Sequence, residues 1–170
     1  IAAAMFFITG SFYERTNTLS IPNMGGLAKV LPIIFAFFLT SSLASLALPG
    51  MSGFVSEITI FLGITSQDHF TSIFRAITIV IAAIGLVLTP IYLLSMCRRV
   101  FFGPRIPALA TTEEMNSREI SIGLSLLFPT LVIGFWPRIA IDLYESTTNA
   151  LAQKLVTHHL ITISQLPSLS

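Results

Sequence analysis

The apolar residues of this chain come in long blocks separated by short polar stretches, and they do not alternate with polar residues. Blocks of this kind predict helices that cross a membrane, since a crossing takes about 20 apolar residues. The predicted membrane segments are residues 1–13, 31–65, 74–97 and 119–136. The first block is shorter than a span, and we expect it to be the second half of a helix that begins before Ile1.

The block at residues 31–64 carries a single charge. As one straight helix it would reach roughly 50 Å, whereas the hydrocarbon core of a bilayer is about 30 Å thick. Its middle contains Pro49, Gly50 and Gly53. Proline removes a backbone donor and clashes with the preceding turn, and glycine adds backbone freedom. We therefore predict two half-helices, 31–48 and 54–65, with these three residues as the hinge, and a broken helix at membrane depth is typical of an ion path.

The end of the chain has a different pattern. Residues 138–163 place apolar side chains near helical spacing with polar residues between them, at Ile139, Leu143, Leu151 and Leu155. This pattern predicts an amphipathic helix at the membrane interface, followed by a tail at 164–170. The predicted fold class is therefore all-α: a multi-span bundle of transmembrane helices with one broken helix and a C-terminal interfacial helix.

Composition agrees with a membrane protein. The 170 residues are 54% hydrophobic and 10% charged, and the mean hydropathy is +0.85, whereas a soluble domain carries about 25% charged residues. The net charge of +1 indicates no nucleic-acid partner. Cys97 is the single cysteine, and His158 and His159 lack the i,i+4 spacing of a helical metal site. With no glycine-rich phosphate loop or cysteine cluster either, we expect no metal, cofactor or redox site in this chain.

Glu57 is the main candidate for chemistry, because it follows the predicted break by a few residues and its neighbours are apolar. An ionised carboxylate is costly in hydrocarbon, so acids inside a membrane usually face a bundle interior and mark proton or ion routes. We predict that Glu57 carries protons. The alternative is a structural acid paired with a basic residue on another helix.

Several polar residues are candidates for lining a proton path. Lys29 precedes the broken helix, where it also suits a role as a charged anchor at the membrane surface. Small hydroxyl residues near the break either pack helices or hold water beside Glu57. The candidate lining residues are Lys29, Ser45, Ser52, Thr59 and Tyr92, and the hydroxyl set near the break also includes Thr40, Ser41 and Ser42.

Four short stretches point to a known family. The first and most specific is LALPGMSGFVSE at residues 46–57; the others are FYERT at 12–16 with MGG at 24–26, LTPIYLLSM at 88–96, and GFWP at 134–137. In order and spacing they resemble the antiporter-like proton-pumping subunits of complex I. The resemblance covers residues 1–145 and is closest to the C-terminal third of the chain 4 subunits of the cyanobacterial and plastid complex.

The resemblance implies a subunit built from two inverted repeats, each with one broken helix, and a proton route of buried Lys, His and Glu side chains. The terminal acid of that route aligns with Glu57, and the other members of the route lie upstream of this chain, so that it cannot pump alone. The redox chemistry, with NAD(P)H or ferredoxin, iron–sulfur clusters and plastoquinone, belongs to other subunits of the complex.

The implied partners are therefore the other membrane-arm subunits and the lipid bilayer, and the implied location is the cyanobacterial thylakoid membrane, with the plastid thylakoid or the mitochondrial inner membrane as alternatives. Some cyanobacterial variants serve carbon dioxide uptake. Three functional hypotheses stay open: a proton-translocating subunit of a photosynthetic, mitochondrial or bacterial NAD(P)H:quinone oxidoreductase, a subunit of a multi-subunit sodium/proton antiporter, and a structural segment in which Glu57 forms a static ion pair.

Overall fold

The computed structural model describes residues 1–66, 71–104, 106–109 and 111–164, and this part of the chain contains helices and no strand. The prediction of an all-helical chain is confirmed for these residues. The chain divides into two units, Ile1–Phe135 and Trp136–Ser170, and each is described by itself.

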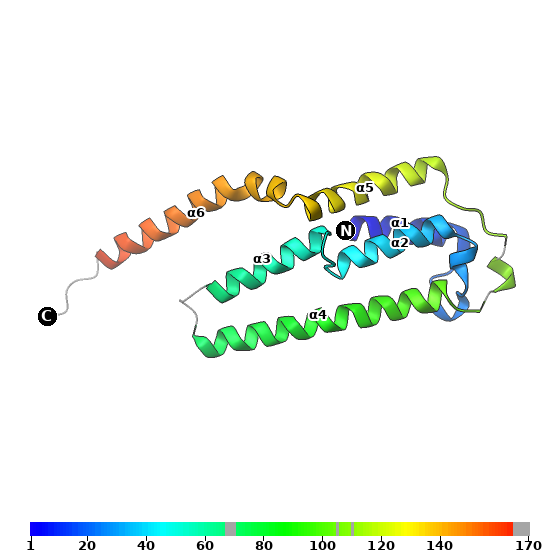
Figure 1. Cartoon of the computed structure of the whole chain (residues 1–170), viewed down its shortest axis with the longest axis horizontal. Helices are drawn as coiled ribbons and strands as arrows, with labels where there is room; N and C mark the ends of the chain where they lie inside the picture. The colour runs from blue at the N-terminus through cyan, green and yellow to red at the C-terminus, as the bar shows by residue number, and fades with distance from the viewer. Residues whose placement is uncertain (67–70, 105, 110, 165–170) are drawn as a thin grey trace. The chain divides into compact units, whose positions relative to one another are not determined.

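The first unit holds five α-helices and the second holds one (Figure 1). Their bounds are α1 Ala2–Thr16, α2 Pro32–Ser45, α3 Ser52–Ser66, α4 Ser72–Phe101, α5 Ser117–Phe135 and, in the second unit, α6 Arg138–Ser164. Three short 3₁₀ helices lie in the connections of the first unit: η1 Ile21–Asn23, η2 Leu27–Lys29 and η3 Pro107–Leu109.

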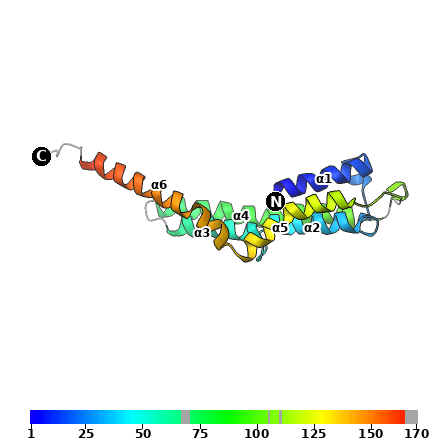
Figure 2. The same ribbon diagram turned by 90° about the horizontal axis from the view of Figure 1, so that it is seen from above.

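Within the first unit, α2 and α3 follow one another in the same direction, and the long α4 returns beside both (Figure 1). With 30 residues, α4 is about as long as α2 and α3 together. Helix α5 then runs back and contacts α2 and α3. Helix α1 contacts α2 and α5, on one side of them (Figure 2). The segment between α2 and α3 thus has α4 and α5 as neighbours of the helices on either side of it, and its residues Leu48 and Pro49 are exposed.

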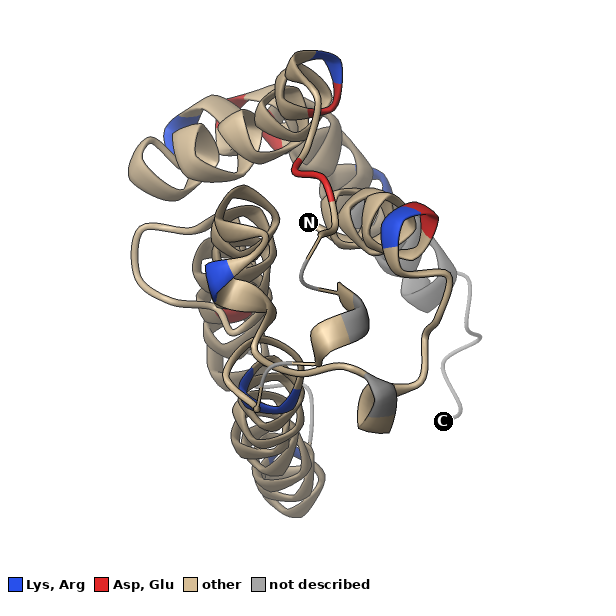
Figure 3. Cartoon of the chain, turned by 90° about the vertical axis from the view of Figure 1, so that its right-hand side faces the viewer, with Lys and Arg blue, Asp and Glu red and all other residues tan. Residues whose placement is uncertain are grey.

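The packed core gathers side chains of α1, α2 and α4 with those of Leu27 and Leu31 from the connection between α1 and α2. Figure 3 faces the end of the first unit at which this connection lies. Leu27, Leu31 and Ile34 are completely buried there. Next to them the ring of Phe101 contacts three other phenylalanines, with centroid distances of 6.2, 5.1 and 5.3 Å to Phe12, Phe35 and Phe38. Aromatic pairs at these separations add to the stability that burial alone provides. This cluster joins α1, α2 and α4.

The outer surfaces of α4 and α5 are apolar. Both helices are long and apolar enough to cross a membrane, with mean hydropathies of 2.5 and 1.4, and only 6% of the apolar window of α4 is buried. A large exposed apolar surface is unfavourable in water and indicates a lipid or protein environment. Helices α2 and α3 are apolar but shorter, with 14 and 15 residues.

Several helices end a few residues away from the approximate bounds that the sequence predicts. The first helix continues past 13 to Thr16, and the helix predicted at 74–97 continues to Phe101 because Val100 and Phe101 are buried in the core. The predicted half-helix 31–48 stops at Ser45, since Ala47 adopts a left-handed backbone conformation with φ 51°, a common way for a helix to end. Of the predicted tail 164–170, residues 165–170 lie outside the described part.

We predict that Phe101→Ala lowers the free energy of unfolding by about 3 kcal/mol, because it leaves a cavity among three aromatic rings. Phe101→Leu keeps most of the volume, and its cost should stay below about 1.5 kcal/mol. Thermal unfolding of the full-length protein in detergent measures both. Equal effects of the two substitutions would contradict the central position of this ring.

Candidate functional site

The segment between α2 and α3, residues 46–51, leaves helical geometry while keeping its backbone donors bonded locally. Leu46 N–H donates to the carbonyl of Ser42 at 2.9 Å, and Met51 N–H donates to that of Leu48 at 3.0 Å. Pro49 has no N–H to satisfy. Ala47 and Gly50 have positive φ angles of 51° and 93°, and for the alanine this conformation costs about 1–2 kcal/mol. The break is therefore a compact, locally bonded turn and not a loose loop.

Two glycines allow neighbouring helices to approach the backbone of the break. A Cβ atom on Gly134 of α5 would lie 2.1 Å from the carbonyl oxygen of Gly50 and 2.6 Å from the Cα of Met51. A Cβ atom on Gly53 would lie 2.3 Å from the carbonyl oxygen of Ala44. Backbone atoms occupy both places, so no side chain fits at either position. Helix α5 therefore packs directly onto the break, a contact that the sequence analysis did not predict.

Glu57 lies in the second turn of α3 and its residue is half-buried, whereas the flanking Ser56 and Ile58 are exposed. Within the described part of the chain, its carboxylate has neither a hydrogen-bond partner nor an ion-pair partner. The basic partner required by the structural alternative is therefore absent from the described residues.

The structure does not gather the predicted lining residues around Glu57. Lys29 is exposed in η2, at the opposite end of α2, and the 14 residues of that helix put about 20 Å between it and the break. Ser45 and Ser52 flank the break and are half-buried. Thr59 is exposed and donates to the carbonyl of Val55 at 2.7 Å. Tyr92 on α4 is 58% exposed. Only the two serines thus lie next to the break.

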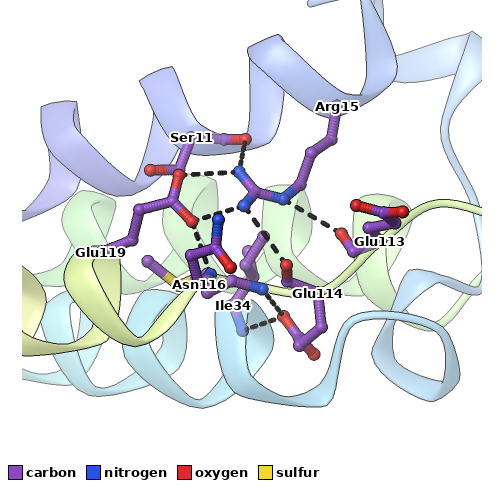
Figure 4. A network of polar contacts seen from close by, with 8 residues as sticks. Ser11, Arg15, Ile34, Glu113, Glu114, Asn116 and Glu119 are labelled. Atoms are coloured by element: carbon purple, nitrogen blue, oxygen red, sulfur yellow. Dashed lines mark hydrogen bonds and ion pairs between the residues drawn. The ribbon is translucent and has the colours of Figure 1, made fainter.

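A polar cluster at the other end of α2, around Arg15, was missed by the sequence analysis (Figure 4). The guanidinium group uses all five of its N–H donors. It forms a two-pronged ion pair with the carboxylate of Glu119 on α5, and it also donates to the carbonyls of Ser11, Glu113 and Glu114. Such a forked geometry is specific to arginine. Arg15 therefore ties the end of α1 to the start of α5 and to the connection that precedes it.

Glu114 extends this cluster to α2 (Figure 4). Its carboxylate accepts a hydrogen bond from the N–H group of Ile34 at 3.3 Å, drawn in Figure 4. It also accepts one from the N–H group of Ile33 at 2.9 Å. These are among the donors that the first turn of a helix leaves unpaired, and a negative charge at this end is also favoured by the helix dipole. One signal was present in the sequence: Asn116 followed three residues later by Glu119 is a helix-start pattern, and the Asn116 N–H donates to Glu119 at 2.8 Å.

Comparison with known proteins identifies the family of this chain. Residues 1–91, which include α1, the break and Glu57, match the transmembrane family described as NADH:quinone oxidoreductase/Mrp antiporter. The chain belongs to this family. The expected resemblance is thereby confirmed, and the position of this family in membranes agrees with the apolar surfaces of α4 and α5.

Several curated relatives of this chain are subunits named NAD(P)H-quinone oxidoreductase chain 4. The chain is 52% and 53% identical to NAD(P)H-quinone oxidoreductase chain 4 1 of Synechococcus sp. (strain JA-2-3B'a(2-13)) and of Synechococcus elongatus, over 91% of its length in each case. It is 45% identical to NAD(P)H-quinone oxidoreductase chain 4 2 of Thermosynechococcus vestitus over 98% of its length. The chain spans about a third of the length of these relatives (30%, 29% and 33%) and matches their C-terminal third.

We predict that Gly134→Ala displaces the break, because the added methyl group meets the carbonyl of Gly50 at far below contact distance. The thermal unfolding midpoint of the full-length protein should fall clearly. Gly63→Ala in α3 is the matched control: nothing lies within 4 Å of its Cβ position, and alanine favours a helix over glycine by about 1 kcal/mol. If both variants unfold at the wild-type temperature, the close packing of α5 on the break is wrong.

We also predict that Arg15→Lys loosens the connection before α5, since an ammonium group has three donors and cannot form the fork. Cleavage by a glutamate-specific protease at Glu113 and Glu114 should become faster. Arg118→Lys serves as the control, because Arg118 is exposed and makes no ion pair among the described residues. Unchanged cleavage in Arg15→Lys would show that the contacts of Arg15 do not hold this connection.

Proposed function

We propose that this chain forms the C-terminal part of a proton-translocating membrane subunit of a photosynthetic NAD(P)H- or ferredoxin:plastoquinone oxidoreductase in a cyanobacterial thylakoid membrane. The observation that carries the proposal is Glu57: a half-buried acid with no ion-pair partner among the described residues, placed just after a helix break. The relatives named NAD(P)H-quinone oxidoreductase chain 4 support the kind of complex.

In this proposal, Glu57 alternates between a protonated and an ionised state. No cation among the described residues pairs with its carboxylate and locks it in the ionised state. A carboxyl group in this condition takes up or releases a proton when the polarity or charge of its surroundings changes. A carboxylate held like that of Glu119, in a forked pair with Arg15, is far less suited to this task because its partner favours the charged form at every step.

Helices α2 and α3 together form one broken membrane span in this proposal. Their 14 and 15 residues are each too few to cross a bilayer, which takes about 20. Joined through residues 46–51, they are long enough, and the locally bonded turn keeps backbone groups from lipid. Helix α6 lies along the membrane interface, which is supported by the exposed apolar side chains of Ile139, Leu143, Leu151 and Leu155.

The redox chemistry belongs to other subunits in this proposal. NAD(P)H or ferredoxin, the iron–sulfur clusters and plastoquinone bind elsewhere in the complex, and the partners of this chain are the neighbouring membrane-arm subunits and lipid. The role of the chain is to carry protons over one part of the route. A variant of the complex linked to carbon dioxide uptake fits the same role.

A sodium/proton antiporter is the second candidate, because the description of the family also includes the Mrp antiporter. The two candidates differ in their partners. An oxidoreductase subunit co-purifies with electron-transfer subunits and translocates ions only while electrons flow, whereas an antiporter exchanges sodium for protons along an existing gradient.

We predict that Glu57→Gln strongly reduces light- or NAD(P)H-driven proton uptake by the intact complex, while assembly is preserved. Glutamine keeps the shape and hydrogen-bonding capacity of the side chain but cannot ionise. Glu113→Gln is the control, since its carboxylate is exposed and makes no contact among the described residues. Wild-type proton uptake in an assembled Glu57→Gln complex would show that this acid is structural and that the proton route runs elsewhere.

A further inference from the structure

Two neighbouring serines on α2, one turn before the break, are completely buried. Ser41 and Ser42 are both 0% exposed, and their hydroxyl oxygens have no hydrogen-bond partner among the described residues. A buried polar group without a partner costs about 1–3 kcal/mol. Two neighbouring groups of this kind therefore need an explanation, because each lowers the stability of the fold as long as its hydroxyl stays without a hydrogen bond.

Other hydroxyl groups on these helices bind their own backbone. Thr40, the preceding residue, donates to the carbonyl of Ala36 at 2.8 Å. On α3, Thr59 donates to Val55 at 2.7 Å and Ser56 donates to Gly53 at 2.8 Å. This local bond is the usual solution for a hydroxyl in a helix. The hydroxyls of Ser41 and Ser42 do not use it, so they remain available to another partner.

A small molecule suits this position. Both serines are buried by residues of this chain, so a partner from outside cannot reach them without rearranging the bundle. Water can bind both hydroxyls, since a buried water binds two to four polar groups.

We propose that Ser41 and Ser42 form a buried water-binding site at the entrance to the break, and that this water extends the proton route of Glu57. The water site itself depends only on the buried hydroxyls. Its place on the route rests on the proposed function. In the route, the hydroxyls accept hydrogen bonds from the water and donate hydrogen bonds to it, which holds the water near the backbone turn. The water passes a proton by breaking one of its O–H bonds as it forms another, without any change in redox state.

The double variant Ser41→Ala/Ser42→Ala of the intact complex separates a hydrated site from a dry one. If the site is dry, the substitution removes two unpaired polar groups, and the thermal unfolding midpoint rises while proton uptake stays at the wild-type level. If the site holds water, the midpoint does not rise and proton uptake per electron falls severalfold. Thr40→Val is the matched control, because its hydroxyl is already bound within α2, and its proton uptake should equal that of the wild type.

A density map of the wild-type complex, at a resolution that shows ordered water, gives a measurement independent of activity. Density within hydrogen-bond distance of both serine hydroxyls, absent from the double variant, is the expected result; a wild-type map without it overturns the proposal. The single variants Ser41→Ala and Ser42→Ala replace the double variant should it fail to assemble. A third outcome is water density in the wild type together with unchanged proton uptake in Glu57→Gln. The water site would then stand, but its place on the proton route and the proposed function would both be refuted.

Discussion

Polar backbone groups away from water must be bonded or covered by protein, and this constraint explains most of the arrangement around residues 46–51. The turn bonds its own donors where it can, through Leu46 and Met51. The carbonyls of Ala44 and Gly50 are then covered by Gly53 and Gly134, where any side chain would collide with them. Because the cover consists of backbone, α3 and α5 lie against the break with no side chain between them at these two positions.

The opposite end of α2 is held by charge as well as by the packed core. Arg15, Glu119 and Glu114 connect the end of α1, the start of α5 and the first turn of α2 through one continuous set of hydrogen bonds. An arginine with all five donors bonded, together with a carboxylate on a helix N-terminus, gives orientation as well as stability. Helix α2 is therefore anchored at both ends, and the polar positions near its break are set by two independent attachments.

The acids of this chain differ mainly in their surroundings. Glu119 and Glu114 have fixed donors and serve the architecture. Glu57 is half-buried and has no such donor among the described residues. The same side chain is thus fixed or left unpaired according to whether a cation or backbone N–H group lies beside it. The buried hydroxyls of Ser41 and Ser42 add to this contrast, because they place unpaired polar atoms within one turn of the break.

The sequence by itself determined the helical class, the apolar segments, the family and the position of Glu57 as the one acid in a long apolar run. These follow from the length of apolar runs, from a proline and glycines in a run too long for one span, and from a lone acid in that run, all of which are local properties. Tertiary structure alone decided that Arg15 meets Glu119, that Gly134 covers Gly50, that Lys29 lies far from Glu57, and that Ser41 and Ser42 are buried without a partner. Those facts depend on which helices become neighbours. The spacing and composition of residues within one segment do not predict how that segment packs against another.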